Sequence, residues 1–256
     1  MHKINKKKYQ EITCAIVIPS LNEKLALPNM LKKLGKLLKE NHAVLVMDDS
    51  IAREAKYIDF HCQTAMENSE ALYFFYSSGV KSGRGAAVMR GFSVAIETFP
   101  NLRYILECDA DGSHQPKDIM KIMKSNLDVD LLIGSRYLKS SKISGWSFSR
   151  RLFSKLLNLI IPRIMNVPVY DITNGLRKYS IPAIHIIMRT PQKNKGFIFL
   201  SEQAELLNRN NFKIKELPIH FIDRTLGKST VTMKEIFNSL IGLGRILLNR
   251  VIKGKE

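Results

Sequence analysis

Two carboxylates, Asp109 and Asp111, stand one residue apart where the apolar run of residues 104–108 gives way to a polar loop. In extended backbone the side chains of residues i and i+2 point to the same side, so both carboxylates can face one ligand. Paired hard oxygen donors suit Mg²⁺ or Mn²⁺, which keeps several waters and commonly bridges to substrate phosphates. An isolated pair of this kind is also typical of a solvated acidic turn, so the surrounding elements must decide between the two interpretations.

Strand-like and helix-like segments alternate along the first half of the chain. Apolar runs typical of strands buried on both faces cover residues 12–18, 43–47, 72–76 and 104–108. Helices are predicted between these runs, over residues 25–40, 52–67 and 85–98. Shorter strands are predicted over residues 130–133 and, with an edge or bend at Pro218, over 213–221. The alternation predicts the α/β class, with a mostly parallel central sheet and helices on both of its faces.

Polar clusters follow three of the predicted strands. They are Pro19 to Glu23, Asp48-Asp49 and Asp109 to Asp111. Ligands bind to open α/β sheets at the carboxyl ends of the strands, so this convergence favours a binding site over a simple acidic turn. His114 is the one histidine beside the acidic pair, and we expect it to be a solvated loop residue.

Glycine-rich and cationic residues are predicted near the same edge. Residues 81–87 form a glycine-rich turn that opens a helix, a geometry that presents backbone amides to phosphate. Arg136 and Arg224 each follow a predicted strand, and arginine is suited to bidentate recognition of phosphate. Each feature alone is typical of an ordinary turn or surface residue. Together with the carboxylate pair, they suggest a diphosphate held by metal and a second phosphate held by arginine.

The chain has 256 residues, enough for one domain with a full core, and a net charge of +17. Residues 131–170 hold seven Lys and Arg and no Asp or Glu. Such a field attracts nucleic acid, anionic lipid or phosphorylated substrates, and charge alone does not choose among them. Cys14 and Cys108 lie in apolar runs, which predicts buried thiols in a reducing compartment. Neither a signal peptide nor a segment that spans a bilayer is expected.

Two segments have an apolar face at helical spacing and a basic polar face. The apolar face of the first consists of Leu152, Phe153, Leu156, Leu157, Ile160 and Ile161. The second segment runs from Met233 to Ile252. Such faces most often pack on the core. Because Trp146 and Phe148 lie near the first segment, which lacks acidic residues, a helix in the membrane interface is equally favoured for at least one of the two.

Motifs along nearly the whole chain resemble, in order, those of the family-two glycosyltransferases with the nucleotide-diphospho-sugar transferase (GT-A) fold. More narrowly, the chain resembles the dolichyl- or polyprenyl-phosphate mannosyltransferase branch. The matching segments are residues 19–23 (P-x-x-N-E), 47–50 (V-D-D-x-S), 83–91 (G-x-G-x-A…G), 109–116 (D-A-D-x-x-H-x-P), 134–137 (G-S-R-Y), 145–151 (G-W…R), 171–177 (D-x-T-x-G-F-R), 197–202 and 218–224.

The resemblance implies roles for individual residues. Binding of the nucleotide sugar is implied for Pro19, Asn22, Glu23, Asp48, Asp49, Gly83 and Arg84. Asp109 and Asp111 would hold Mg²⁺ or Mn²⁺ against the diphosphate, and with Arg136 they would be catalytic. Contact with the acceptor phosphate and the diphosphate is implied for Arg136, Arg150, Arg224 and Lys228.

The chain departs from the family pattern at two places. The family usually adds an Asp and a Thr after D-D-x-S, whereas this chain reads Ile51-Ala52-Arg53-Glu54. The branch's lysine after G-x-S is Thr230 here, although Lys228 or Lys234 supplies a charge nearby. The first departure leaves the donor base and sugar open, and the second concerns the acceptor.

The resemblance implies an inverting hexosyltransferase that moves mannose from GDP-mannose onto a polyprenyl or dolichyl phosphate. Residues 1–230 would form the GT-A catalytic domain, and residues 231–256 a basic amphipathic helix in the membrane interface. The enzyme would then be peripheral on the inner, cytoplasmic membrane face, compatible with a membrane-spanning partner subunit and with no nucleic acid as ligand.

Alternative functions keep the fold and change a substrate. The donor is then UDP-glucose or a UDP-amino sugar, or the acceptor is a soluble glycan. A rival from another class is a non-catalytic basic module that binds lipid or nucleic acid. Asp109 and Asp111 argue against that rival, because carboxylates at the centre of a basic face repel a polyanion unless a metal intervenes.

Overall fold

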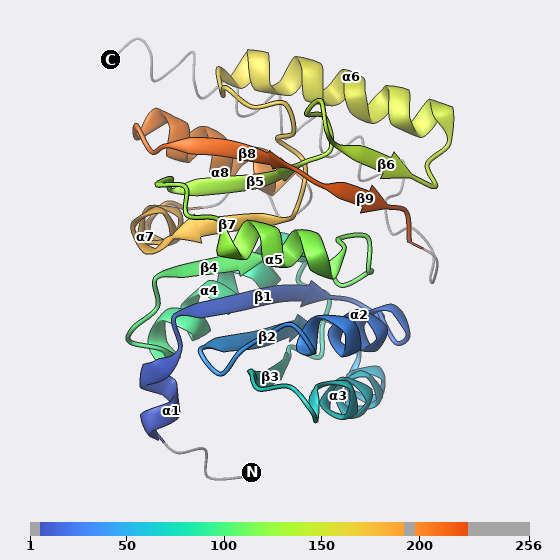
Figure 1. Cartoon of the computed structure of the whole chain (residues 1–256), viewed down its shortest axis with the longest axis vertical. Helices are drawn as coiled ribbons and strands as arrows, with labels where there is room; N and C mark the ends of the chain where they lie inside the picture. Colours follow the sequence, from blue (N-terminus) through green and yellow to red (C-terminus); the bar gives the residue numbers. More distant parts are fainter. Residues whose placement is uncertain (1–5, 192–197, 225–256) are drawn as a thin grey trace.

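Seven strands form the central sheet of residues 6–191 and 198–224, the part of the chain that the computed structural model describes (Figure 1). Their spatial order is β3 (Leu72–Ser77), β2 (His42–Asp48), β1 (Cys14–Ser20), β4 (Tyr104–Glu107), β7 (Arg177–Ser180), β5 (Leu131–Ser135) and β8 (Ile214–Pro218). β7 runs antiparallel to both of its neighbours, and the other neighbours in this sheet pair in parallel. The predicted mostly parallel sheet is therefore confirmed.

Apolar side chains alternate between the two faces of the sheet and build a core on each. In β1, Ala15 and Val17 join one core, while Cys14 and Ile16 join the other. The first core includes residues of α4 (Arg84–Thr98), α6 (Phe148–Met165), α7 (Ile181–Arg189) and α8 (Ile198–Arg209). The second includes residues of α2 (Ala26–Gly35), α3 (Ala52–Met66) and α5 (Pro116–Lys124). All three cysteines are buried and free, as predicted for Cys14 and Cys108.

Shorter elements lie beside the central sheet. They are α1 (Lys6–Glu11), which precedes β1, and the strands β6 (Lys142–Ser144) and β9 (His220–Ile222), which pair in parallel as a second sheet. The last predicted strand is divided at Pro218, the final residue of β8, in agreement with the expected bend. An isolated bridge joins Phe221 to His114, so β9 lies beside the loop that follows β4.

α6 carries an apolar surface that the described residues leave uncovered. Its exposed apolar side chains are Phe148, Leu152, Phe153, Leu156, Leu159 and Ile160, with exposed fractions from 40% to 81%. Ile161 and Met165 are buried, so one edge of the helix packs on the core. No helix in the two described ranges is long and apolar enough to cross a membrane. The helix predicted over residues 233–252 and the domain boundary predicted after residue 230 lie outside those ranges.

Candidate active site

The acidic pair lies in the loop directly after β4, at the carboxyl end of the parallel strands. Arg84, at the start of α4, donates to Asp109 Oδ1 from Nη2 at 2.8 Å and from Nε at 3.2 Å. The same guanidinium forms an ion pair with Glu107, a fully buried residue of β4. Burial acts to raise the pKa of Asp109, but Arg84 outweighs this effect, and the pKa falls to about 2. Asp109 is therefore an anion at neutral pH, held in place by Arg84.

Asp111, Arg224 and Glu23 form a second charged cluster that joins three parts of the chain. Arg224, just after β9, places Nη2 2.9 Å from Asp111 Oδ2 and Nη1 3.7 Å from Glu23 Oε1. Burial, with added repulsion from Asp111, raises the pKa of Glu23 to about 7. The structure thus brings three predicted site residues together, and one of them changes its protonation near neutral pH.

His114 is fully buried, which corrects the expectation of a solvated loop side chain. Its Nδ1 accepts the backbone N–H of Asp109 at 3.1 Å, and its Nε2 lies 2.9 Å from Oδ1 of Asn174. A neutral ring that accepts at Nδ1 carries its proton on Nε2, which it donates to Asn174. Asn174 in turn donates to the carbonyl of Gly134 in β5. His114 therefore ties the acidic loop to the segment before β7 and to β5.

Gly175 allows the segment before β7 to approach the acidic loop closely. A Cβ at this position would lie 2.8 Å from Asp109 Oδ1 and closer still to Arg84 Nη2. Only glycine, which has no Cβ, permits this approach without a shift. The segment that resembles the family's D-x-T-x-G-F-R motif thus forms a wall behind the Arg84–Asp109 pair.

Arg136, predicted as catalytic, is engaged by Asp171 and by aromatic rings. Its Nε and Nη2 donate to the two carboxylate oxygens of Asp171, both at 2.7 Å. Its guanidinium carbon lies 5.4 Å from the ring centroids of both Trp146 and Phe221. Although burial acts to lower the pKa of Arg136, Asp171 more than offsets it, and the pKa is raised. Arg136 is thus a fixed cation, and its charge helps to lower the pKa of Asp109.

Arg150, near the start of α6, is paired with Asp223 and lies over Trp146. Its Nη1 is 2.9 Å from each carboxylate oxygen of Asp223, and its guanidinium carbon is 4.5 Å from the indole centroid. Because Asp223 directly precedes Arg224, Arg150 approaches the same end of β9 as the second charged cluster. Lys228, also predicted on the acceptor side, lies outside the described residues.

The carboxylates of Asp48 and Asp49, at the end of β2, are bound by donors of the protein itself. Asp48 is buried and accepts from the backbone N–H and the hydroxyl of Ser50 at 2.9 and 3.0 Å. Asp49 accepts from the hydroxyl of Ser78, the N–H and hydroxyl of Ser82, the N–H of Gly83 and the guanidinium of Arg90. Burial acts to raise the pKa of Asp49, but these hydrogen bonds, those from Ser82 first, lower it. The glycine-rich turn is predicted to present its backbone amides to phosphate. In the structure, two of these amides, those of Ser82 and Gly83, donate to Asp49.

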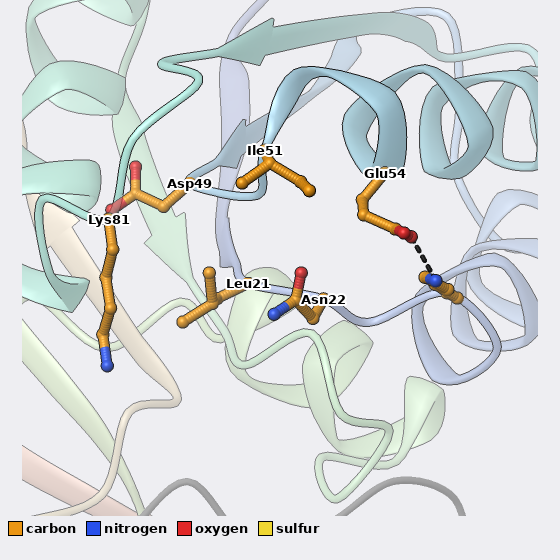
Figure 2. Close-up of a pocket in the computed structure, with 7 residues that line it drawn as sticks. Leu21, Asn22, Asp49, Ile51, Glu54 and Lys81 are labelled. Carbon is orange, nitrogen blue, oxygen red and sulfur yellow. Dashed lines mark ion pairs between the residues drawn. The ribbon is translucent and has the colours of Figure 1, made fainter.

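A pocket of about 710 Å³ opens beside Asp49 (Figure 2). It is lined by Leu21, Asn22, Lys24, Asp49, Ile51, Glu54 and Lys81. Asn22 adopts a left-handed conformation (φ 60°), and its N–H donates to Ser50 Oγ at 2.8 Å, which fixes the loop after β1 against the turn after β2. Ile51 and Glu54 belong to the segment that departs from the family pattern, so this departure lies in the wall of the pocket.

A family model described as glycosyl transferase family 2 matches residues 15–189, a span that contains the acidic pair and the pocket. The chain belongs to glycosyl transferase family 2. It is accordingly a glycosyltransferase, as the sequence resemblance implied.

Two curated relatives of this glycosyltransferase match over most of its length. The polyprenol monophosphomannose synthase of Mycolicibacterium smegmatis is 28% identical over 222 residues, which cover 86% of this chain and 82% of that protein. The undecaprenyl-phosphate mannosyltransferase of Micrococcus luteus is 29% identical over 230 residues, which cover 90% of this chain and 91% of that protein.

The fold of the glycosyltransferase also matches solved structures. The glucosyl-3-phosphoglycerate synthase of Mycobacterium tuberculosis, in complex with Mn²⁺, UDP-glucose and phosphoglyceric acid, gives a TM-score of 0.60 at 13% identity. The match covers 96% of this chain and 82% of that one. At this identity the likeness shows the fold, and it confirms the predicted GT-A class.

The acidic pair of the glycosyltransferase keeps oxygen atoms available for a cation. Within the described ranges, no group of three or more His, Cys, Asp or Glu side chains is placed to hold a metal ion. Among those residues, Asp109 Oδ2 accepts no hydrogen bond, with His114 Nε2 3.8 Å away, and Asp111 Oδ1 accepts the N–H of Ser113 at 3.0 Å. Two carboxylates suffice for Mg²⁺ or Mn²⁺ when water and substrate phosphates complete the coordination. The residues present therefore fit such an ion.

Proposed function

We propose that this glycosyltransferase transfers mannose from GDP-mannose to a polyprenyl or dolichyl phosphate, with inversion at the anomeric carbon. The observation that carries the proposal is the pairing of Asp109 with Arg84 and of Asp111 with Arg224 at the carboxyl edge of the sheet. A donor diphosphate and an acceptor phosphate require cations beside a metal-binding carboxylate pair. The two relatives named for mannosyl transfer to polyprenyl phosphate, matched over 82% and 91% of their lengths, support this choice of substrates.

Asp109 and Asp111 would hold the divalent cation, Mg²⁺ or Mn²⁺. Bound there, the ion would neutralise charge on the departing diphosphate as a Lewis acid. Arg84 keeps Asp109 ionised and oriented, and the hydrogen bond from the backbone of Asp109 to His114 fixes the start of the loop. The carboxylate pair is thereby preorganised, so its orientation does not have to be established during the reaction.

The acceptor phosphate supplies its own nucleophile. A phosphate monoester has a second pKa of about 6 and is largely dianionic at neutral pH, so no dedicated general base is required. Arg224 and Arg150 contribute positive charge where two phosphate-bearing substrates would otherwise repel each other, and Lys228 is predicted to add to it. Arg136 contributes its charge from a fixed position against Asp171.

The lipid part of the acceptor is proposed to stay in the bilayer while the enzyme lies on the cytoplasmic face. The exposed apolar residues of α6, together with Arg150, Arg151 and Lys155 on the same helix, are suited to an anionic membrane surface. The helix predicted over residues 231–256 and a membrane-spanning partner subunit remain part of this proposal.

A transfer assay with the purified full chain tests the function. The assay combines GDP-mannose or UDP-glucose with a short polyprenyl phosphate, with Mg²⁺, with Mn²⁺ or with chelator. We expect mannosyl-phosphoryl lipid from GDP-mannose, loss of product with chelator, and a fall in rate of about 100-fold or more in Asp111→Asn.

The matched control is Asp128→Asn, since Asp128 is 96% exposed and pairs only with Lys213 among the described residues. This variant should keep the wild-type rate. Unchanged transfer by Asp111→Asn would contradict the metal site, transfer from UDP-glucose alone would contradict the donor, and equal transfer to a lipid-free phosphate would contradict the acceptor.

A further inference from the structure

We propose that Lys24 and Glu54 recognise the base of the donor and select guanine. The proposal rests on the function proposed above and places the donor base in the pocket beside Asp49, whose lining residues Asn22 and Asp49 are predicted to bind the nucleotide sugar. Lys24 follows β1 and Glu54 lies in the first turn of α3, and the two form an ion pair at one end of the pocket (Figure 2). Their side chains are 44% and 20% exposed, so a ligand in the pocket can reach both.

Glu54 is a pocket carboxylate with acceptor capacity to spare. Asp49, which also lines the pocket, already accepts five hydrogen bonds from the protein. Glu54 has one partner in the described part of the chain, Lys24. A carboxylate oxygen accepts more than one hydrogen bond, and such bonds are stronger than those between neutral groups. The open acceptor therefore favours a ligand that brings N–H donors.

The order of charges in this pair matches the hydrogen-bonding edge of guanine. Guanine presents the O6 acceptor beside the N1–H and N2–H donors, so the Lys24 ammonium can donate to O6 while the Glu54 carboxylate accepts from N1 and N2. Uracil places N3–H between two carbonyl oxygens, and a carboxylate that binds N3–H meets one of these oxygens with its own. Adenine and cytosine present an amino group where guanine has O6, which opposes a lysine cation. Guanine is the base for which O6, N1–H and N2–H each meet a group of opposite hydrogen-bonding character on Lys24 or Glu54.

Apolar surface for the faces of the base comes from Ile51 and Leu21. Ile51 is 62% exposed, and Figure 2 shows it and Leu21 on opposite sides of the opening, with Glu54 beyond one end and Lys81 near the other. Covering Ile51 with a purine removes apolar area from water, which favours binding. A base with its edge at Glu54 leaves its ribose and diphosphate toward Asp49 and Lys81.

Calorimetric titration of the full chain with GDP, IDP and UDP, in buffer with Mg²⁺, tests the proposal. IDP differs from GDP only in lacking the N2 amino group and so loses one charge-assisted hydrogen bond to Glu54. We expect IDP to bind about tenfold more weakly than GDP, and UDP more weakly than IDP. Equal binding of GDP and IDP by the wild type would overturn the proposal without any variant.

The variant Glu54→Gln keeps the size of the side chain and replaces one acceptor oxygen with a donor. We expect its affinity for GDP to fall about tenfold and its affinities for GDP and IDP to become nearly equal. Glu67→Gln, at the exposed far end of α3, is the control and should keep both wild-type affinities. If folded Glu54→Gln prefers GDP over IDP by the same factor as the wild type, Glu54 does not bind the N2 amino group and the proposal is overturned.

The transfer assay separates this proposal from the proposed function. Transfer of mannose from GDP-mannose with equal binding of GDP and IDP would leave the function standing and remove the role of Glu54. Discrimination of GDP from IDP through Glu54, without mannosyl transfer to polyprenyl phosphate, would leave the base assignment standing and remove the function.

Discussion

Replacing Gly175 with alanine tests whether the position of Asp109 limits the rate of sugar transfer. The new Cβ would lie 2.8 Å from Asp109 Oδ1 and closer to Arg84 Nη2, whereas ordinary contacts begin at 3.4 Å. Asp109 must therefore retreat by about 0.6 Å, the difference between these two distances. Arg84 Nη2 lies closer to the new Cβ and must shift by more than Asp109, which also strains its ion pair with the buried Glu107.

The size of the expected effect follows from this displacement. A misplacement of about 1 Å costs roughly 100-fold in rate, so about 0.6 Å predicts a fall in kcat of about tenfold. Overpacking of this kind also lowers the free energy of unfolding by about 1–3 kcal/mol, which corresponds to a fall in Tm of roughly 2–12 °C.

Initial rates at saturating donor and acceptor give kcat, and thermal melting followed by circular dichroism gives Tm. Gly35→Ala is the control. Gly35 is the last residue of α2, and its new Cβ would lie 3.0 Å from Met66 Sδ and would contact no site residue. It should lower Tm while keeping the wild-type kcat. A wild-type kcat in folded Gly175→Ala, or an equal fall in both variants, would refute the argument that Asp109 must lie where Arg84 holds it.

Three further predictions concern charge and surface. The pKa of Glu23 is raised from its usual 4.5 to about 7, so the folded state binds the proton more tightly, and the free energy of unfolding falls as pH rises from 4.5 to 7. The free energy of unfolding of Glu23→Gln, relative to that of the wild type, should therefore increase by up to about 3 kcal/mol from pH 4 to pH 8 when both proteins are titrated with urea. A difference that is the same at both pH values would contradict this. Arg136→Lys should cost about 2–3 kcal/mol in urea unfolding, because lysine cannot fill both oxygens of Asp171, and a loss under 0.5 kcal/mol would contradict the buried pair. Leu156→Asp on α6 should weaken binding to anionic vesicles about tenfold in flotation assays, whereas Phe60→Asp on α3, at the other end of the molecule in Figure 1, should not; equal effects would contradict docking through α6.

Strands β1 and β2 can be predicted from sequence because both of their faces are covered. A strand in that position must be apolar at nearly every residue, and such runs are visible without any structure. The position of Asp109 and Asp111 directly after a strand predicts that both lie at the carboxyl edge of the sheet, which is confirmed. The roles of the individual residues in donor and acceptor binding stay predictions.

β7 carries no comparable signal, although it lies between β4 and β5. Its four residues are mostly polar, and Arg177 is nevertheless fully buried. The guanidinium donates to the backbone carbonyls of Ile172, Asn174 and Leu200, and among the described residues it forms no ion pair with a carboxylate. The expectation that His114 is solvated is wrong for the same reason, because its partners are a backbone amide and Asn174, 60 residues away. Burial that depends on distant backbone atoms leaves no pattern in the local sequence.

The pocket that is proposed to bind the base and the acidic pair are built by different residues, and Asp49 lies between them. Asp49 lines the pocket and binds the amides of Ser82 and Gly83 at 2.8 and 3.0 Å, and the next residue, Arg84, holds Asp109. Glu54 takes no part in this connection. With the donor base in the pocket, as proposed above, a change at residues 51–54 alters the base that is bound without moving the carboxylates at which transfer is proposed to occur. This separation accounts for a chain that departs from its family at the wall of the pocket and keeps the family's residues around the acidic pair.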